Sequence, residues 1–278
     1  MDNNKIVPGY WRWLEGAGIA LVVALLAGCA TNPEYDDPRD PWEGFNRSMF
    51  EFNDGLDRAI FKPLAKGYKA ITPEPVDKGI TNFYANLSDV GSAINNLLQV
   101  KLQRAGTDVG RVVVNTTLGL LGFFDVATNL NLPRYHEDFG QTFGVWGAES
   151  GPYIVLPLFG PSTGRDAVGL VFDWLADPIR YVSTTDGLRF ALLSIWFVDR
   201  RADLLGASRL VEQAALDPYQ FVRDAYLQRR RYDIYDGNPP PEPYEDVLEF
   251  NPDLLGEEGG VDPEAPAEQG PGPAPVTQ

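Results

Sequence analysis

Few residues of this chain belong to the types that carry catalytic or metal chemistry. Its 278 residues include a single histidine, His136, and a single cysteine, Cys29. His136 precedes Glu137 and Asp138, which suggests a base with an orienting acid, but neighbouring side chains point in different directions and no G-x-S-x-G turn accompanies them. We therefore expect His136 to be an exposed loop residue and the protein not to be an enzyme.

Other catalytic patterns are equally weak. Residues 160–165 (GPSTGR) lack the spacing and the lysine of a phosphate-binding loop. A zinc site would need carboxylates for most of its ligands, because one histidine and one cysteine supply too few. The sequence predicts neither a metal site nor a cofactor.

Cys29 lies in a more specific context. Lys5 and Arg12 precede an uncharged run over 17–28, and the run ends in Leu-Ala-Gly-Cys. A basic start, a short apolar stretch and small residues predict a secretory signal peptide over 1–28. The last four residues resemble the bacterial lipobox, which implies that the Cys29 thiol receives a diacylglycerol. The alternative is a chance tetrapeptide with a buried thiol.

The charge balance excludes a nucleic-acid binder, because such proteins neutralise phosphates with a basic face. The chain has 23 Lys and Arg against 39 Asp and Glu, a net charge of -16. Residues 237–278 hold ten acids, ten prolines and no base. This composition predicts a disordered acidic tail, either merely solvated or docking a basic partner, after a folded domain over 29–236.

Helix signals dominate that domain. Asp40-Pro41-Trp42-Glu43 is typical of a helix start, and we expect this helix to end near Lys62-Pro63. A second start at Thr72 precedes apolar residues at spacings of three and four over 76–97, which predicts an amphipathic helix with its apolar face packed on other helices. A third helix begins near Asp217-Pro218. Its basic run 229–231 is either a solvated helix end or a lipid head-group contact.

Three stretches are unusually apolar. Residues 112–124 form a helix of only about 20 Å at most, short of a hydrocarbon core of about 30 Å. Residues 139–164 are rich in Gly and Pro, which favours loops and short extended pieces. Residues 190–198 are apolar on nearly all sides. These stretches are either soluble core or partly embedded in a bilayer to which a lipid anchor holds the chain.

Several segments together resemble the MlaA/VacJ family of outer-membrane lipoproteins, in order and between about residues 29 and 237. They are DPWEGFNR (40–47), MFEFN (49–53), NTTLG (115–119), GFFDVA (122–127), EDFGQTFGVWG (137–147), GPYIVLP (151–157), GPSTGRD (160–166), LDPY (216–219) and RDAYLQRR (223–230). Ala30, rather than Asp, follows the cysteine, which by the same resemblance favours delivery to the outer membrane.

The resemblance implies an all-α, ring-like monotopic membrane-embedded domain with short irregular apolar loops. It also implies a function: removing mislocalised phospholipid from the outer leaflet and passing it to a soluble periplasmic carrier (MlaC), so that outer-membrane lipid asymmetry is maintained. The protein would be lipid-anchored in the periplasmic leaflet and associated with trimeric porins. The competing hypothesis is a structural envelope lipoprotein that binds porins without moving lipid.

Moving a phospholipid requires a polar path for the head group beside apolar walls for the acyl chains. Small and hydroxyl-bearing residues inside an apolar stretch suit such a path. The candidates are Asn115, Thr116, Thr117, Gly119 and Gly122.

Overall fold

The structure is a computed structural model that describes residues 37–182 and 185–241. The predicted signal peptide, Cys29 and most of the acidic tail therefore lie outside the described residues. Contacts divide the chain into one unit that ends at Pro239 and a second from Pro240 to Gln278. All of the described helices and strands belong to the first unit.

The first unit is mainly helical, with one short β-hairpin, as the sequence predicts. Its elements are α2 (Glu43–Leu56), the π-helix η1 (Asp57–Phe61), α3 (Lys62–Ile71), α4 (Glu74–Leu98), α5 (Leu102–Thr117), α6 (Val126–Asn129), α7 (Phe139–Val145), β1 (Tyr153–Leu156), β2 (Gly160–Thr163), α8 (Gly164–Ala176), α9 (Ile179–Val182), α10 (Asp186–Asp203), α11 (Leu205–Ala214) and α12 (Pro218–Ile234).

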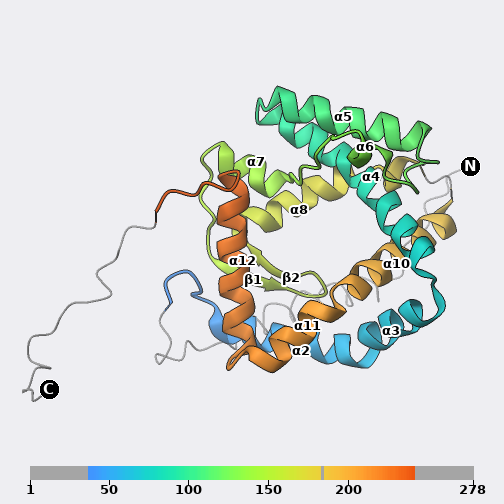
Figure 1. The fold of residues 1–278 in the computed structure, drawn as a ribbon. Helices are drawn as coiled ribbons and strands as arrows, with labels where there is room; N and C mark the ends of the chain where they lie inside the picture. The colour runs from blue at the N-terminus through green and yellow to red at the C-terminus, as the bar shows by residue number, and fades with distance from the viewer. Residues whose placement is uncertain (1–36, 183–184, 242–278) are drawn as a thin grey trace, which may run out of the picture. The chain divides into compact units, whose positions relative to one another are not determined.

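Within this unit the elements follow one another around a closed ring (Figure 1). Helix α3 packs on α10, α10 on α4, α4 on α7, and α7 on α12. Helix α12 then contacts strand β2. Strand β1, which pairs with β2, packs on α2, and α2 continues through η1 into α3. The ring-like architecture implied by the family resemblance is thus present.

The first helix does not end where the sequence predicts. The chain remains helical through Lys62 and Pro63, passing from α2 through η1 into α3. Proline is tolerated in the first turn of a helix, where its missing N–H has no partner to lose. The π-helical turn just before it resets the hydrogen-bond register, which makes Pro63 the start of a new helix rather than a stop.

Helix α4 begins after Pro73, as predicted, but the burial of its two sides differs from the prediction. Several polar residues of the helix are fully buried, whereas Val76, Ile94 and Leu97 are exposed. The buried residues of α4 are Gly79, Tyr84, Asn86, Asp89, Ser92, Asn95 and Asn96. The expected packing of an apolar face on other helices is therefore wrong at both ends of this helix, whereas Ile80, Phe83, Leu87 and Val90 between them are half-buried.

The three apolar stretches take different forms. Helix α5 ends at Thr117, and residues 118–124 form irregular turns rather than a continued helix. The 139–164 stretch contains the predicted extended pieces as the antiparallel hairpin of β1 and β2. It also contains helix α7, which the sequence does not predict and which begins where the Asp138 carboxylate accepts a hydrogen bond from the N–H of Gln141. Residues 190–198 lie in the middle of α10.

The classical apolar core of the unit is small. Tyr153 and Val155 of β1 and Tyr219 of α12 are almost fully buried against one another, with Met49 and Phe50 of α2 packed at their edge. The predicted start of α12 is confirmed, because the Asp217 carboxylate accepts hydrogen bonds from the N–H groups of Tyr219 and Gln220. This cluster fixes the hairpin between the first and last helices of the ring.

Candidate functional site

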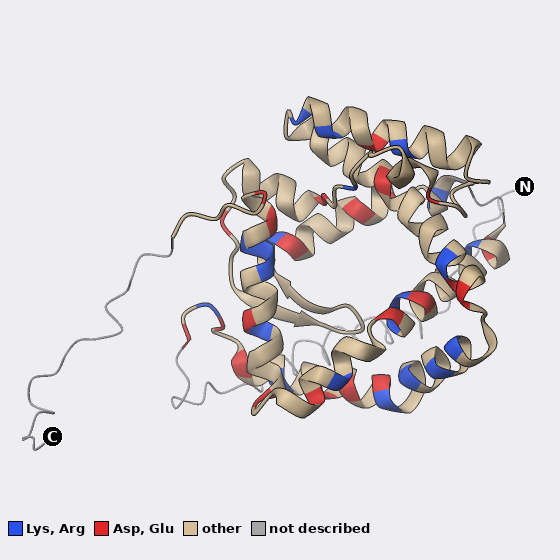
Figure 2. Ribbon diagram, viewed as in Figure 1, with Lys and Arg blue, Asp and Glu red and all other residues tan. Residues whose placement is uncertain are grey.

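Most of the buried side chains of the ring wall are polar, and many large apolar side chains are exposed. The buried polar and charged residues are Asp40, Asn46, Asn86, Asp89, Ser92, Asn95, Asn96, Gln99, Asp108, Arg111, Asn115, Gln141, Thr142, Ser162, Thr163, Asp166, Asp199 and Arg223. Asp and Arg are almost never fully buried in water-soluble proteins unless they are paired. Figure 2 shows charged positions spread over nearly all of the ring's helices.

The seam between α4 and α5 centres on Arg111, whose side chain is 0% exposed. Its Nε donates to Asp89 at 3.0 Å and its Nη2 donates to both carboxylate oxygens of Asp125 at 3.1 Å. Its Nη1 donates to the carbonyl of Leu132 at 2.6 Å. This guanidinium therefore joins α5 to α4 and to the loop on either side of α6.

Asn115, one of the predicted lipid-path residues, belongs to the same seam. Its side-chain amide donates to Asp125 at 3.1 Å, and its Oδ1 accepts from the N–H of Ala127 at 2.8 Å. Both ends of the amide are thus committed within the protein. Thr116 accepts from the Asn86 amide at 3.0 Å, whereas the exposed Thr117 hydroxyl donates back to the carbonyl of Val113.

Gly119 and Gly122, the other two predicted residues, are required by close packing. A Cβ on Gly119 would lie 2.2 Å from the carbonyl oxygen of Phe124, and Gly122 has φ +91 and would meet the Asn86 side chain at 2.6 Å. Glycine is the only residue that avoids both contacts and accepts a positive φ without strain. The turns that these glycines permit expose four large apolar side chains: Leu118, Leu120, Leu121 and Phe124.

The five candidates therefore lie at the end of α5 and in the turns that follow it. Their surroundings differ: Asn115 is buried, whereas Thr117 is exposed. Their contact with lipid stays a prediction. Leu118, Leu120 and Leu121 beside them expose more apolar surface than the five candidates do. The sequence analysis did not single out these leucines. The alternation of small and large residues over 118–124 is the signal that points to such a projecting turn.

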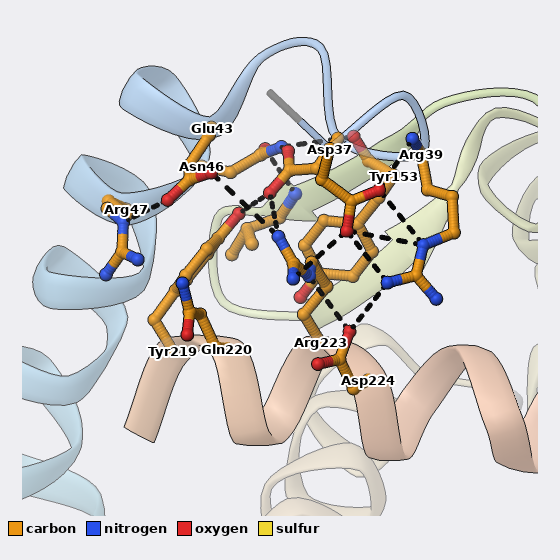
Figure 3. A network of polar contacts seen from close by, with 12 residues as sticks. Asp37, Arg39, Glu43, Asn46, Arg47, Tyr153, Tyr219, Gln220, Arg223 and Asp224 are labelled. Atoms are coloured by element: carbon orange, nitrogen blue, oxygen red, sulfur yellow. Dashed lines mark hydrogen bonds and ion pairs between the residues drawn. The ribbon is translucent and has the colours of Figure 1, made fainter. Parts of the chain in front are cut away.

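A second polar network closes the ring between its first and last helices (Figure 3). Asn46 of α2 donates to Asp40 at 2.7 Å and to the Tyr153 carbonyl at 3.1 Å, while its Oδ1 accepts from the N–H of Val155. Asp40 in turn accepts from the Tyr219 hydroxyl and from Arg223 of α12. The motif residues at the start of α2 thus bind the hairpin and α12 together.

A third network joins α12 to α7 and α8. Arg230 donates to Asp138 at 2.5 and 2.9 Å and pairs with Asp166 at 3.0 Å, and the Tyr226 hydroxyl donates to Asp166 at 2.7 Å. Burial alone would raise the pKa of Asp138, but the hydrogen bonds and the charge of Arg230 hold it below its usual range. Within the predicted basic run, Arg230 is therefore an internal tie, and Arg229 pairs with Asp233.

The residues considered for catalysis do not form a catalytic arrangement. His136 is an exposed loop residue, as expected, and Glu137 pairs with Lys101 instead. Residues 160–163 are strand β2, and Thr163 caps α8 by accepting from the N–H of Asp166. Among residues 37–182 and 185–241, no group of three or more His, Cys, Asp and Glu side chains is placed to hold a metal ion.

Asp108 of α5 provides a pH-dependent test of the polar interior. Burial, together with the nearby Asp89 charge, raises the pKa of Asp108 to about 6, although Asn96 donates to it at 2.8 Å. A raised carboxyl pKa means that the folded state binds this proton more tightly than the unfolded state. Stability therefore falls as the pH rises from about 4 to about 6 and is then constant.

We expect Asp108→Asn to be more stable than the wild type at pH 7.5 by on the order of 1–3 kcal/mol, and equal to it below pH 4. The amide that this substitution introduces can donate to the Asn96 Oδ1, which is buried without a partner. Thermal melts across pH 4–8 measure the difference. A constant difference at all pH values would show that Asp108 does not titrate in this range.

The described part of the chain thus combines a closed helical ring, buried polar seams and many exposed large apolar side chains. No helix in the part of the chain that the structure describes has the length and apolar character needed to cross a bilayer. The family model for the MlaA lipoprotein matches residues 38–233. The chain belongs to the MlaA lipoprotein family.

Individual relatives agree. The Escherichia coli K12 protein called intermembrane phospholipid transport system lipoprotein MlaA is 34% identical over 246 residues, 87% of this chain and 97% of its own length. Its Haemophilus influenzae counterpart is 33% identical over 234 residues, 78% of this chain and 90% of its own. An uncharacterized protein of Rickettsia bellii is 34% identical over 196 residues, 70% of this chain and 76% of its own.

A solved structure also matches the fold. It is described as the structural basis for maintenance of bacterial outer membrane lipid asymmetry, and it superposes with a TM-score of 0.62 at 36% identity. The match covers 70% of this chain and 98% of the other chain.

Proposed function

We propose that this protein is the outer-membrane lipoprotein component of an intermembrane phospholipid transport system, which removes mislocalised phospholipid from the outer leaflet. The observation that carries the proposal is the unusual burial in the ring: charged and amide side chains are buried in its seams, and many leucines, valines and aromatic residues are exposed. All three apolar stretches place large side chains on the surface, including Leu120, Phe159 and Phe190. A soluble core, the alternative for these stretches, would bury them.

The physical reason is the solvent. Hydrocarbon provides no hydrophobic force that drives helices together, so helices in lipid associate through close packing and interhelical hydrogen bonds. The seams of Arg111, Asn46 and Arg230 are of this kind. Exposed apolar side chains that would be costly in water are then at their most favourable next to acyl chains.

The lipid specificity of the proposal comes from the relatives, two of which are called phospholipid transport lipoproteins, and from the matched structure's connection with lipid asymmetry. The family resemblance further supports a position in the periplasmic leaflet, a periplasmic MlaC-like carrier as acceptor, and trimeric porins as neighbours. The ring wall of residues 112–124 remains the proposed place where head group and acyl chains are separated. No bond chemistry is needed, so we propose no catalytic step.

A transfer assay tests this function. Full-length lipidated protein in outer-membrane vesicles is mixed with a periplasmic carrier, and fluorescent phospholipid on the carrier is measured over time. We expect transfer to require the protein, and deletion of its gene to expose phospholipid in the outer leaflet. Normal porin association with no transfer and no loss of asymmetry would favour the structural lipoprotein instead.

Anchoring through Cys29 gives a separate prediction. Cys29→Ser removes the thiol that would receive the lipid, so we expect an uncleaved or mislocalised precursor and loss of outer-leaflet asymmetry. Two or three acyl chains supply the stable attachment that one apolar face lacks. Labelled palmitate and membrane fractionation measure the outcome. Equal palmitate incorporation in wild type and variant would contradict the lipid anchor.

A further inference from the structure

A groove of about 840 Å³ lies between α2 and η1 on one side and α11 with the first turns of α12 on the other. Figure 1 shows these elements meeting where the last helix of the ring returns to the first. Its lining residues include none from the 118–124 turn or from the polar seam of α4 and α5. Pockets of several hundred Å³ are the usual size for small-molecule ligands.

The groove has two kinds of lining. Phe50, Leu204, Val211 and Val222 line its apolar part. Its charged part comes mainly from α2 and η1, where Glu51, Asp54 and Arg58 follow one another at spacings of three and four. Residues at these spacings lie on one side of a helix. A ligand in the groove therefore meets a row of charges of both signs beside an apolar surface.

The charges of this row differ in how they are paired. Arg58 pairs with Asp54 at 3.0 Å and Lys62 pairs with Glu212 at 2.6 Å. Arg47 is held by Asp217 at 2.8 Å. Glu51 has no cationic partner among the described residues, and it lies one helical turn from both Arg47 and Asp54. The groove therefore offers an uncompensated carboxylate to a positive group, and a negative group would share Arg58 and Lys62 with their present partners, Asp54 and Glu212.

The proposed lipid anchor limits the distance between this groove and the bilayer. Asp37 follows Cys29 by eight residues, which span at most about 28 Å. Asp37 is tied to Arg223 at 3.1 Å, and Arg223 lies one turn along α12 from Tyr219, which lines the groove. The proposed lipid on Cys29 would therefore limit how far Asp37 and the adjoining groove can lie from the leaflet surface, where the amphipathic molecules at hand are phospholipids.

We propose that this groove binds a zwitterionic aminophospholipid, with the ammonium at Glu51, the phosphate towards Arg58 and Lys62, and an acyl chain along Phe50 and Val222. This assignment rests on the proposed function and adds a preference: a phospholipid with an ethanolamine head group is favoured over an anionic one such as phosphatidylglycerol. The phosphate is common to both lipids, so Glu51 is the residue that separates them.

The test uses full-length lipidated protein in nanodiscs that contain photoreactive phosphatidylethanolamine or phosphatidylglycerol at equal fractions. Cross-linked peptides are identified by mass spectrometry. In the wild type we expect the ethanolamine lipid to label residues 47–62 and 204–222 about two- to fivefold more than the glycerol lipid, the range of an exposed ion pair. Glu51→Lys should abolish or reverse that ratio.

Two further variants separate specificity from occupancy. Ala207→Trp places a large ring in the groove and should lower the labelling of both lipids. Glu149→Lys makes the same charge change at an exposed carboxylate outside the groove lining and should leave the labelling ratio unchanged. Far-ultraviolet circular dichroism and thermal melts confirm that each variant is folded.

Each contrary outcome has its own meaning. Equal labelling by both lipids, unaffected by Glu51→Lys, would overturn the preference. No labelling of the groove in a protein that still transfers lipid to the carrier would overturn the groove assignment and leave the proposed function intact. If lipid labelled the groove but the protein transferred no phospholipid to the carrier, the proposed function would be contradicted and the groove assignment would stand. Loss of carrier binding in Ala207→Trp with unchanged lipid labelling would identify a protein-docking groove and overturn the assignment.

Discussion

Replacing Arg111 by alanine is expected to destabilise the ring by about 3–5 kcal/mol, the cost of leaving a buried charge without its partner. Arg111 is 0% exposed. Its removal takes a donor from the partly buried Asp125 and from the buried Asp89, which among the described residues keeps only its ion pair with Arg134. The Leu132 carbonyl also loses its donor. For a domain of this size the melting temperature should fall by roughly 6–20 °C.

The matched control is Arg58→Ala, which also removes an arginine paired with an aspartate, but at the surface. The side chains of Arg58 and Asp54 are 64% and 39% exposed, so the expected loss is below about 1 kcal/mol. Thermal melts of both variants in the same detergent provide the comparison. If Arg111→Ala melted within a degree or two of Arg58→Ala, the seam between α4 and α5 would not depend on this guanidinium.

The sequence predicts element type better than it predicts burial. Capping residues and proline positions are local signals, and they locate the starts of α4 and α12 correctly. The predicted end of the first helix is wrong because a proline is ambiguous: Pro63 stops a helix if the register continues, but begins one after a π-turn. Helix α7 is missed because its glycines favour loops, whereas the Asp138 cap and the Arg230 bonds outweigh that preference.

The exposure of apolar residues at both ends of α4 could not be predicted, because the prediction assumes that water surrounds the protein. Apolar spacing over 76–97 predicts a buried face only if water surrounds the protein. Asn86, Asp89 and Asn96 lie on the opposite side, and their hydrogen bonds with α5 decide which side is inside. Nothing in a single sequence says which of two faces of an amphipathic helix turns towards hydrocarbon. The Cys29 context is the only sequence signal for a nearby bilayer.

The candidate site shows the same division between local and tertiary information. The segments that carry the family resemblance are where the interhelical ties occur: Asn46, Asp125, Asp138, Asp166 and Arg230 each bond across a seam. Sequence reasoning recognises the segments but not this role, because the partners are far apart in the chain, such as Asp138 and Arg230. The groove of α2 and α11 has no sequence signal at all.

The second large effect is expected at the 118–124 turn, and it separates contact with lipid from general damage. Gly119 does not serve for this test, because even a methyl group there would collide with the Phe124 carbonyl. Thr81 is equally unsuitable as a control, since its hydroxyl donates to the Asp199 carboxylate and an added acid would lie beside it. Leu121 is the better position: its side chain is 66% exposed and its φ is 60.

Leu121→Asp should leave the fold intact in detergent, because aspartate tolerates a positive φ better than leucine and the Leu121 side chain is mostly exposed. In the bilayer the same carboxylate would face hydrocarbon, where a charge costs about 2.5–3.5 kcal/mol at full depth. We therefore expect phospholipid transfer to the carrier to fall by at least about tenfold, which corresponds to about 1.4 kcal/mol. Melting temperature and lipidation should match the wild type.

The control is Gln103→Asp, an exposed polar residue on α5 between Lys101 and Arg104, where one more negative charge is solvated and lies close to cations. It should transfer lipid at the wild-type rate. Both variants add one carboxylate at an exposed position of the α5 region, so a difference between them reports the surroundings of the side chain rather than the charge itself. If Leu121→Asp also transferred lipid normally, the leucines of the turn would face water, and the ring wall over 112–124 would not be the path of the lipid.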